Sequence, residues 1–428
     1  FGFFSSFNSD LVRDVTVFKG GIPANYGGRA SSIVDIQYKD GDLNDWHGKA
    51  SIGMLSTKLT ADGPIIQDKL SVVLGARASY INYLLARSKN PDISNSRAAF
   101  YDGNVILNYF PSENHKITYS YYNSYDQFSL ISDTTISWRN QVHSLIYKGQ
   151  TTENLFTTLS FVSSQYDYRI ANDFRISGFD LDSKILDNGL NAGVEYKIGD
   201  GNSIMGGFQT KLIQINPSKL KPGPQSSLDP FDAGEERAIE SGLYFQHDLD
   251  ITKAIRLSYG LRYARYNYLG ENEVFVYREN QPKREENIID TLFYKTNESI
   301  VSNGGFEPRV SLRVSFDETT SIKIGYNRIH QFIHLISNTT TIAPTDVWKL
   351  SDTYLRPAIA QQYSAGIFKN LLDNMIETSI EAYYKDQEGI VEYKDGAELL
   401  MNPHLETELL SGKGRSYGLE VYLKKTKG

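Results

Sequence analysis

The chain has 428 residues, a net charge of −7 at neutral pH and no cysteine. The lack of cysteine excludes a disulfide scaffold, a cysteine zinc site and a thiol nucleophile. Mild acidity without a basic block argues against nucleic acid as a partner, and no apolar run reaches the roughly 18 to 20 residues that a spanning helix needs. A large β protein is expected, either soluble or in an outer membrane.

Residues 1–45 differ in composition from the rest of the chain and are predicted to form a separate unit. An alternating run at 10–19 and a β-like run at 32–38 flank a stretch that contains Gly20, Gly21, Gly27 and Gly28. A phosphate-binding loop is disfavoured because GxxxxGK[ST] is absent. The chain opens without methionine and closes on KKTKG, so we expect a piece of a longer protein.

From residue 46 onward, apolar and polar residues alternate with a period of two. One example is the apolar series Leu190, Ala192, Val194, Tyr196 and Ile198, whose intervening residues are polar or glycine. This pattern is typical of strands whose two faces meet different surroundings. A soluble sandwich would also alternate, so the connections between strands must decide.

The connections alternate between short and long. Short polar turns are predicted at 63–68, 111–114, 149–154, 199–202, 252–253, 317–320 and 370–373. Long connections are predicted at 81–97, 124–135, 168–186, 217–235, 269–305, 337–357 and 391–414. Transmembrane barrels have short turns on one rim and long loops on the other, whereas nothing enforces that rule in a sandwich. The predicted fold is therefore an all-β, antiparallel transmembrane barrel with strands of roughly 10 to 14 residues.

The strand count follows once the segment 46–65 is divided near 55–57 into a tight first hairpin. About 16 strands result, and the last runs over 416–425. Aromatic residues next to the short turns are expected at the headgroup level of the inner rim: Tyr109, Phe110, Tyr147, Tyr196, Phe316 and Phe368.

Several segments resemble TonB-dependent outer-membrane receptors. FGFFSSFNSDLVRDVTVFKGGIPANYGGRASSIVDIQYKDG is similar to the end of their plug domain, in particular in the Bacteroidota group with a carboxypeptidase-regulatory-like domain. The segments EPRVSLRVSF, APTDVWKLSD, QQYSAGIFKN and GKGRSYGLEVYLKK resemble the barrel. The resemblance implies a plug end at 1–45 and barrel strands 1–16 at 46–428, out of 22 strands in the full protein.

The resemblance also implies location in the outer membrane of a Gram-negative bacterium, as a multi-pass barrel in contact with its lipids. Import would be energised by TonB, ExbB and ExbD through an N-terminal region outside this chain, and a surface lipoprotein could cover the loops. No catalytic residue, cofactor or metal is expected.

Charged residues suggest contacts between plug and wall. Lys19 and Arg29 lie on the plug piece, and Glu377, Glu381 and Glu420 share the inward register of strands 15 and 16. We expect some of these groups to pair and to favour the closed state. The alternative is a solvated lumen lining, in which charged residues need no specific partner.

Two further groups of residues are weighed as sites. His330 and His334 are expected to be imidazoles at the outer rim, since Gln331 breaks the HExxH motif. Loop 269–305 is rich in charge but lacks the spacing of a calcium loop, so a solvated loop is expected.

Three functions remain open. The first is energised import of a bulky nutrient such as an iron chelate, cobalamin, an oligosaccharide or a peptide. The second is a receptor-like barrel that serves as a structural subunit of a larger outer-membrane complex. The third is a soluble β-rich binding domain, which the alternation of short and long connections disfavours.

Overall fold

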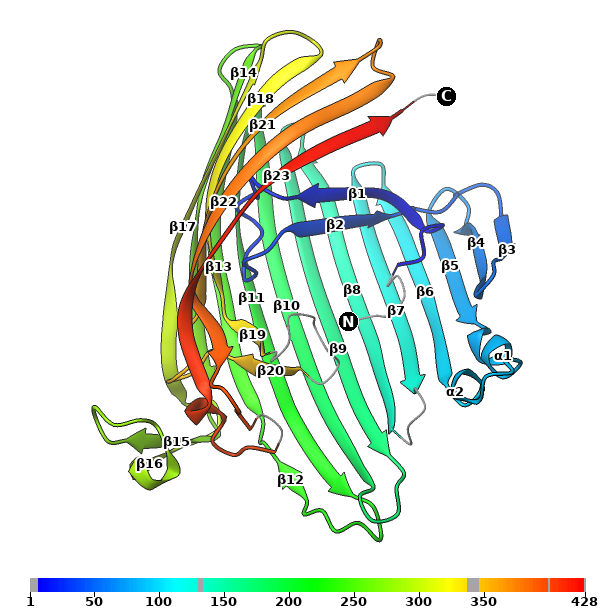
Figure 1. Ribbon diagram of the computed structural model, residues 1–428. Helices are drawn as coiled ribbons and strands as arrows, with labels where there is room; N and C mark the ends of the chain where they lie inside the picture. Colours follow the sequence, from blue (N-terminus) through cyan, green and yellow to red (C-terminus); the bar gives the residue numbers. More distant parts are fainter. Residues whose placement is uncertain (1–6, 130–133, 337–345, 399–400, 427–428) are drawn as a thin grey trace.

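A computed structural model describes residues 7–129, 134–336, 346–398 and 401–426. One antiparallel sheet has 17 strands, and β12 (Phe231–Asp232) is a two-residue member of it. Figure 1 shows how this sheet curves into a barrel. The other members are β3 (His47–Ile52), β4 (Ser56–Ile66), β5 (Leu70–Ser79), β6 (Arg97–Ser112), β7 (His115–Ser129), β8 (Thr134–Thr152), β9 (Leu155–Asn172), β10 (Phe179–Gly199), β11 (Asn202–Pro222), β13 (Glu236–Asp250), β14 (Ile255–Leu269), β17 (Ser299–Ser315), β18 (Thr320–Gln331), β21 (Ala358–Leu371), β22 (Ile376–Tyr393) and β23 (Leu409–Lys425). The all-β barrel class is confirmed.

Three two-stranded sheets and a few short helices complete the described structure. Strands β1 (Val12–Phe18) and β2 (Ile33–Tyr38) pair with each other, as do β15 (Asn272–Tyr277) with β16 (Ile288–Tyr294) and β19 (Ile333–Ile336) with β20 (Val347–Leu350). Helices α1 (Ile81–Leu85) and α2 (Pro91–Ser94) lie between β5 and β6, and the 3-10 turns η1 (Glu285–Asn287) and η2 (Leu405–Thr407) lie in other loops. No helix of the described residues is long and apolar enough to cross a membrane.

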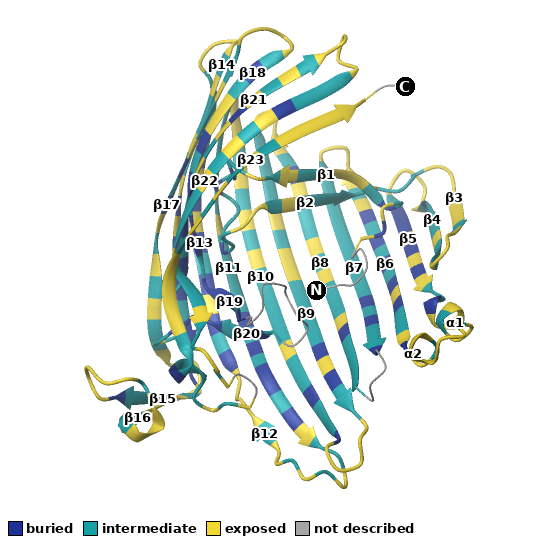
Figure 2. Cartoon of the chain, viewed as in Figure 1, coloured by how far each residue is buried: buried dark blue, intermediate teal, exposed yellow. Residues whose placement is uncertain are grey.

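The alternating apolar and polar residues of the sequence lie on opposite faces of the sheet. In β13, Leu243 and Phe245 are 63% and 46% exposed on the outer face, whereas Glu240 and Tyr244 are 4% and 5% exposed on the lumen face. Figure 2 shows the same banding along neighbouring strands. A strand that is apolar outside and polar inside is stable where hydrocarbon covers the outer face.

The strands are longer than predicted, and two loops are correspondingly shorter. Strands β10 and β11 each have 21 residues; β7 runs to Ser129 and β8 begins at Thr134, both inside the connection expected at 124–135, and the connection expected at 168–186 shrinks to 173–178. The ladder continues because every added antiparallel pair satisfies backbone groups in water as well as in hydrocarbon.

Phe368 departs from its predicted place. Tyr196 and Phe316 are exposed as expected, at 48% and 65%. Phe368 instead lines a cavity on the lumen side, because Ile367, its neighbour, occupies the outward register. The prediction of a headgroup position for Phe368 was therefore wrong.

The two-stranded sheet β1–β2 lies inside the curve of the large sheet (Figure 1). Leu11 packs against Val73 of β5 and Ile106 of β6, with all three side chains buried and Tyr38 against them. We call residues 7–45 the lumen segment, and residues 19–32, which join β1 to β2, the lumen turn.

Candidate functional site

The lumen turn lies against the inner wall of the barrel, and its middle is fully buried. Ile22 is 2% exposed and Ala24 is 0% exposed. Gly21 and Gly28 adopt left-handed backbone angles, φ +61° and +78°, which a residue with a Cβ atom rarely adopts. The turn can therefore follow the wall closely.

Three buried charged residues form the centre of the wall at this place. Glu307 of β17 is 0% exposed, and it lies between Arg309 of the same strand and Arg262 of β14, which are 4% and 3% exposed. Arg309 Nη2 donates to Glu307 Oε2 over 3.0 Å, and Arg262 Nε lies 3.7 Å from the same oxygen. Glu307 Oε1 also accepts the backbone N–H of His330 at 2.7 Å. A buried carboxylate is tolerated only with this degree of pairing.

The same wall holds the backbone of the lumen turn. Arg309 Nη1 donates to the carbonyl of Pro23 and, at 3.4 Å, to that of Ile22. Ala24 N–H donates to Gln246 Oε1 at 2.8 Å, and Gln209 Nε2 donates to the Asn25 carbonyl at 2.7 Å.

The hydrogen bonds from the wall to the lumen turn are made to backbone groups. They therefore determine the path of the turn but place no requirement on its side chains. Gln209 also accepts from Arg262 Nη1 at 2.8 Å, so the amide bridges the charged centre and the turn.

Two glycines of the turn are needed for this close approach. A Cβ on Gly27 would lie 2.4 Å from Arg262 Nε, and one on Gly28 would lie 2.3 Å from Glu240 Oε1. Both distances are far inside van der Waals contact, so any side chain here must displace a buried charged group.

The opposite side of the turn meets β21, β22 and β23 through more exposed groups. Lys19 forms an ion pair with Glu420 of β23, and the two side chains are 50% and 41% exposed. Glu381 of β22 stands directly across from Glu420 in the ladder. Two carboxylates in such positions repel each other, and the Lys19 ammonium next to them offsets that repulsion.

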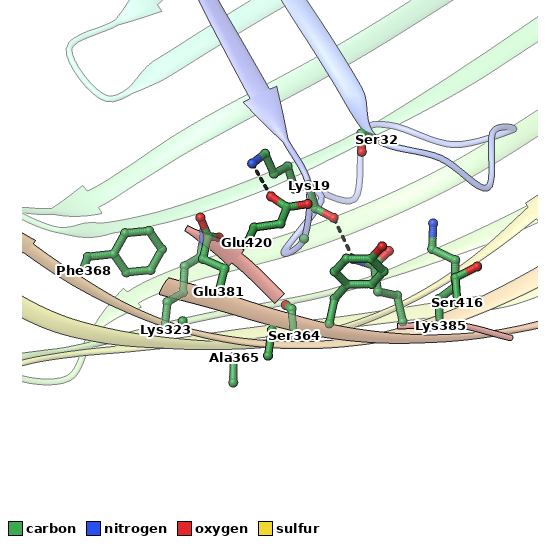
Figure 3. A pocket seen from close by; sticks show the side chains of 15 residues that line it. Lys19, Ser32, Lys323, Ser364, Ala365, Phe368, Glu381, Lys385, Ser416 and Glu420 are labelled. Carbon is green, nitrogen blue, oxygen red and sulfur yellow. Dashed lines mark hydrogen bonds and ion pairs between the residues drawn. The ribbon is translucent and has the colours of Figure 1, made fainter. Parts of the chain in front are cut away.

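A cavity surrounds this contact. It lies between Lys19, Gly20 and Ser32 of the turn and the wall strands β18 and β21 to β23, and it includes Glu381, Lys385 and Phe368 (Figure 3). Gln362 Nε2 donates to the Lys19 carbonyl at 2.7 Å, and Lys385 Nζ donates to the Ala30 carbonyl at 3.2 Å. The turn is therefore held here by one buried amide, since Gln362 is 6% exposed, and by the more exposed Lys385 and Lys19–Glu420 contacts.

The remaining predicted site residues lie elsewhere. Glu377 is inward-facing but is 3.8 Å from Lys424 of β23, so its partner belongs to the wall. Arg29 points toward the other side of the barrel, where Glu240 and Asp187 are its acidic neighbours. The structure thus brings together Lys19, Glu381 and Glu420, and it does not bring Arg29 or Glu377 to them.

The residues just before β1 and just after β2 form further ionic contacts with the wall. Asp10 pairs with Lys49 at 2.5 Å, and Asp40 pairs with Lys116. The Asp40 carbonyl also accepts from Asn108 Nδ2 at 2.7 Å. These residues were not predicted, because their positions 39 to 76 residues apart in the chain show no motif.

The two histidines, expected as imidazoles at the outer rim, are both buried: His330 lies near the end of β18 and His334 lies in β19. His330 is 3% exposed, with Nδ1 at 3.2 Å from Glu307 Oε1, and His334 is 5% exposed, with Nε2 at 2.9 Å from Ser351 Oγ. The chain turns into the lumen after Gln331, which buries both rings. Among the described residues, no group of three or more metal-binding side chains lies together.

The charge-rich loop 269–305, for which a solvated loop was expected, contains a paired hairpin, β15–β16. Tyr277 OH donates to Glu406 Oε1 at 2.6 Å, and Phe275 packs edge-on to His404 with ring centroids 4.6 Å apart. Loop aromatics therefore pack on other loops here.

Comparisons with solved structures agree on the fold. The alcaligin outer-membrane receptor FauA from Bordetella pertussis has a TM-score of 0.64 at 12% identity, over 97% of this chain and 64% of that one. The hemophore receptor HasR from Serratia marcescens, a double mutant with HasA and heme, has a TM-score of 0.69 at 12% identity, over 97% and 67%. FpvA from P. aeruginosa, bound to a heterologous pyoverdine and iron, has a TM-score of 0.68 at 13% identity, over 98% and 58%.

This chain spans about two thirds of the length of these proteins or slightly less. No curated protein sequence matches it. The matched structures are receptors and transporters, not enzymes. The family model for the TonB dependent receptor-like β-barrel matches residues 67–424, and the chain therefore belongs to the TonB-dependent receptor β-barrel family.

Proposed function

We propose that residues 1–45 are the end of a plug and residues 46–428 the first 16 strands of the barrel of a receptor that imports a bulky nutrient. Its place would be the outer membrane of a Gram-negative bacterium, where lipid covers exposed outward residues such as Leu243. The observation that carries the proposal is the lumen turn: it occupies the barrel interior and is bound to the wall on two sides.

The two sides of the lumen turn suggest how the closed state is kept and released. Arg309, Gln246 and Gln209 hold the turn through buried hydrogen bonds. Lys19 pairs with Glu420 in an accessible cavity, where water can replace either partner. Force applied through TonB, ExbB and ExbD to an N-terminal region outside this chain would break the exposed pair before the buried set.

The ligand class is proposed from the ligands of the similar proteins. Those described above concern alcaligin, heme, and iron with pyoverdine, and a fourth similar structure is the copper transporter OprC, so an iron or copper chelate stands first for this chain. Cobalamin, an oligosaccharide and a peptide are the other candidates. A surface lipoprotein over the loops is proposed as a further partner.

The test is energy-dependent uptake by cells that express the full-length receptor. Labelled ferric siderophores, heme, a copper chelate, cobalamin, an oligosaccharide mixture and a peptide mixture are supplied with and without a protonophore. We expect uptake of at least one ligand that requires both the receptor and the proton-motive force. A receptor that is folded in the membrane but supports no such uptake with any of them would point to a structural subunit instead.

A further inference from the structure

The hairpin β19–β20 departs from the barrel wall and enters the lumen (Figure 1). Strand β18 pairs with β21 as far as Gln331, and the chain then turns at Phe332, which is 0% exposed. The two arms pair only with each other in the ladder, from Ile333–Leu350 to Ile336–Val347. Residues 337–345 lie outside the described part of the hairpin.

A buried ionic clamp fixes the second arm to the wall. Lys349 Nζ lies 2.6 Å from Glu236 Oε1 on β13 and 2.9 Å from Asp352 Oδ2. The other oxygen of Glu236 accepts the backbone N–H of Leu350 at 2.7 Å. The three charged side chains are 8% to 13% exposed, so water does not compete effectively with these contacts.

A cluster of buried apolar side chains packs against the same arm. Tyr266 of β14 stacks on Phe332, with ring centroids 4.7 Å apart and planes 5° from parallel, and its hydroxyl donates to the Ser351 carbonyl at 2.6 Å. The buried cluster around them comprises Ile213, Ile215, Ala238, Ala264, Tyr268, Ile333 and Leu350. The second arm of the hairpin is therefore held in one arrangement by buried packing and by the ion pairs of Lys349.

The root of this hairpin touches the lumen turn. Ala30 N–H donates to Gln331 Oε1 at 3.0 Å, while Gln331 Nε2 donates to the Ile333 carbonyl at 2.9 Å. The Gln331 amide therefore joins the lumen turn directly to the first arm of the hairpin. Gln331 is the last residue of β18 in the ladder with β21, and Phe332 directly after it is held by the stack on Tyr266.

We propose that the β19–β20 hairpin is a fixed internal support that positions the lumen turn. Lys349 acts as the positioning residue, and Gln331 is the connection through which its effect reaches Ala30. Breaking the clamp would loosen a part of the lumen segment that Lys349 does not touch. The inference rests on the proposed function only in treating residues 19–32 as part of a plug.

Mobility of the lumen turn tests the proposal without any substrate. The chain has no cysteine, so Ser31→Cys, at an exposed position next to Ala30, provides one site for a spin label. Cysteines outside this chain are replaced by serine, and the full-length receptor is measured in lipid vesicles. Lys349→Met is expected to narrow the label's spectrum, which reports faster motion.

The matched control is Lys219→Met. Lys219 pairs with Asp232 at the same 2.6 Å, but both side chains are 45% exposed and the pair is remote from the lumen turn. This control is expected to leave the spectrum unchanged. Where Lys349→Met does not fold, as judged by heat-modifiable gel mobility, the double variant Glu236→Gln/Lys349→Met removes both charges and takes its place.

A double-mutant cycle separates positioning from general loosening. Gln331→Ala alone should increase label motion, and Lys349→Met should add little in that background, because the connection is already gone. An unchanged spectrum in a folded clamp variant overturns the proposal. The proposal is also overturned if Lys349→Met increases label motion as much in the Gln331→Ala background as it does alone. Neither result depends on uptake, so loss of the transport hypothesis is distinguishable from loss of this one.

Discussion

The lumen turn is held in two different ways on its two sides. Toward β11, β13 and β17, Arg309 and two glutamines bind backbone groups in a region where Glu307 and Ala24 are 0% exposed. Toward β22 and β23, the ion pair of Lys19 and Glu420 is about half exposed and borders a cavity. A buried bond is costly to leave unmade, whereas an exposed pair exchanges readily with water. One side can therefore serve as an anchor and the other as a contact that exchanges.

The largest effect is expected from the anchor side, with Arg309→Met. This change leaves Glu307 buried without its closest cation and removes the donor to the Pro23 carbonyl. Removal of one partner of a buried pair costs about 3–5 kcal/mol. Amide hydrogen exchange in residues 22–25 of the full-length receptor should accelerate strongly, compared with Arg256→Met, whose pair with Asp250 is exposed. Unchanged exchange would mean that the two sides do not differ.

The next effect is expected at Gly28. Gly28→Ala places a Cβ at φ +78° and 2.3 Å from Glu240 Oε1, so either the turn or the Glu240 carboxylate must shift. The left-handed conformation alone costs about 1 kcal/mol, and displacement of a buried carboxylate adds to it. The melting temperature of the receptor should fall, whereas Gly396→Ala, also at positive φ but with open space, serves as the control for backbone strain. Equal losses in both variants would show that contact with the wall is unimportant.

Charge reversal at Arg29 should have an intermediate effect. Arg29→Glu brings a third acidic group toward Glu240 and Asp187, so we expect weaker closure and increased entry of a large antibiotic into cells. Lys39→Glu, which reverses a charge on the same segment outside that acidic region, is the comparison. If antibiotic exclusion and uptake both stay at the unmodified level in Arg29→Glu, then Arg29 has no part in closure.

The smallest effect is expected on the exposed side. Lys19→Met removes the partner of Glu420, and exposed pairs contribute about 0–1 kcal/mol. The hydrogen bond to Glu420 raises the pKa of Lys19, so its charge and the contact persist below the ordinary lysine pKa and are lost only as pH rises through the raised value. Because the pair is exposed, the free energy of unfolding of Lys19→Met should differ little from that of the unmodified receptor. High salt screens the charges and should reduce the difference further. A loss as large as that of Arg309→Met would remove the distinction between anchor and exchanging contact.

Part of the site was predictable and part was not. Alternation indicated that Glu381 and Glu420 face inward, and the resemblance suggested that Lys19 lies in the plug. Their proximity then depends on the register that pairs Glu381 with Glu420. The buried centre was missed, although Arg262 and Arg309 stand in clearly alternating strands, because inward-facing charge is ordinary in a lumen and gives no sign of burial. His330 does lie at the end of β18, as predicted, but His334 was misplaced because the chain leaves the wall at Phe332 and continues as β19.

The sequence by itself determined the class of the fold and the inward or outward direction of most side chains. Both follow from a local period of two, which each strand expresses without reference to its neighbours. The tertiary structure alone decided which charges meet: Arg309 reaches the carbonyl of Pro23 across 286 positions, and Glu236 reaches Lys349 across 113. Burial of those groups arises only when the lumen segment and the β19–β20 hairpin cover the wall, and no local pattern encodes that covering.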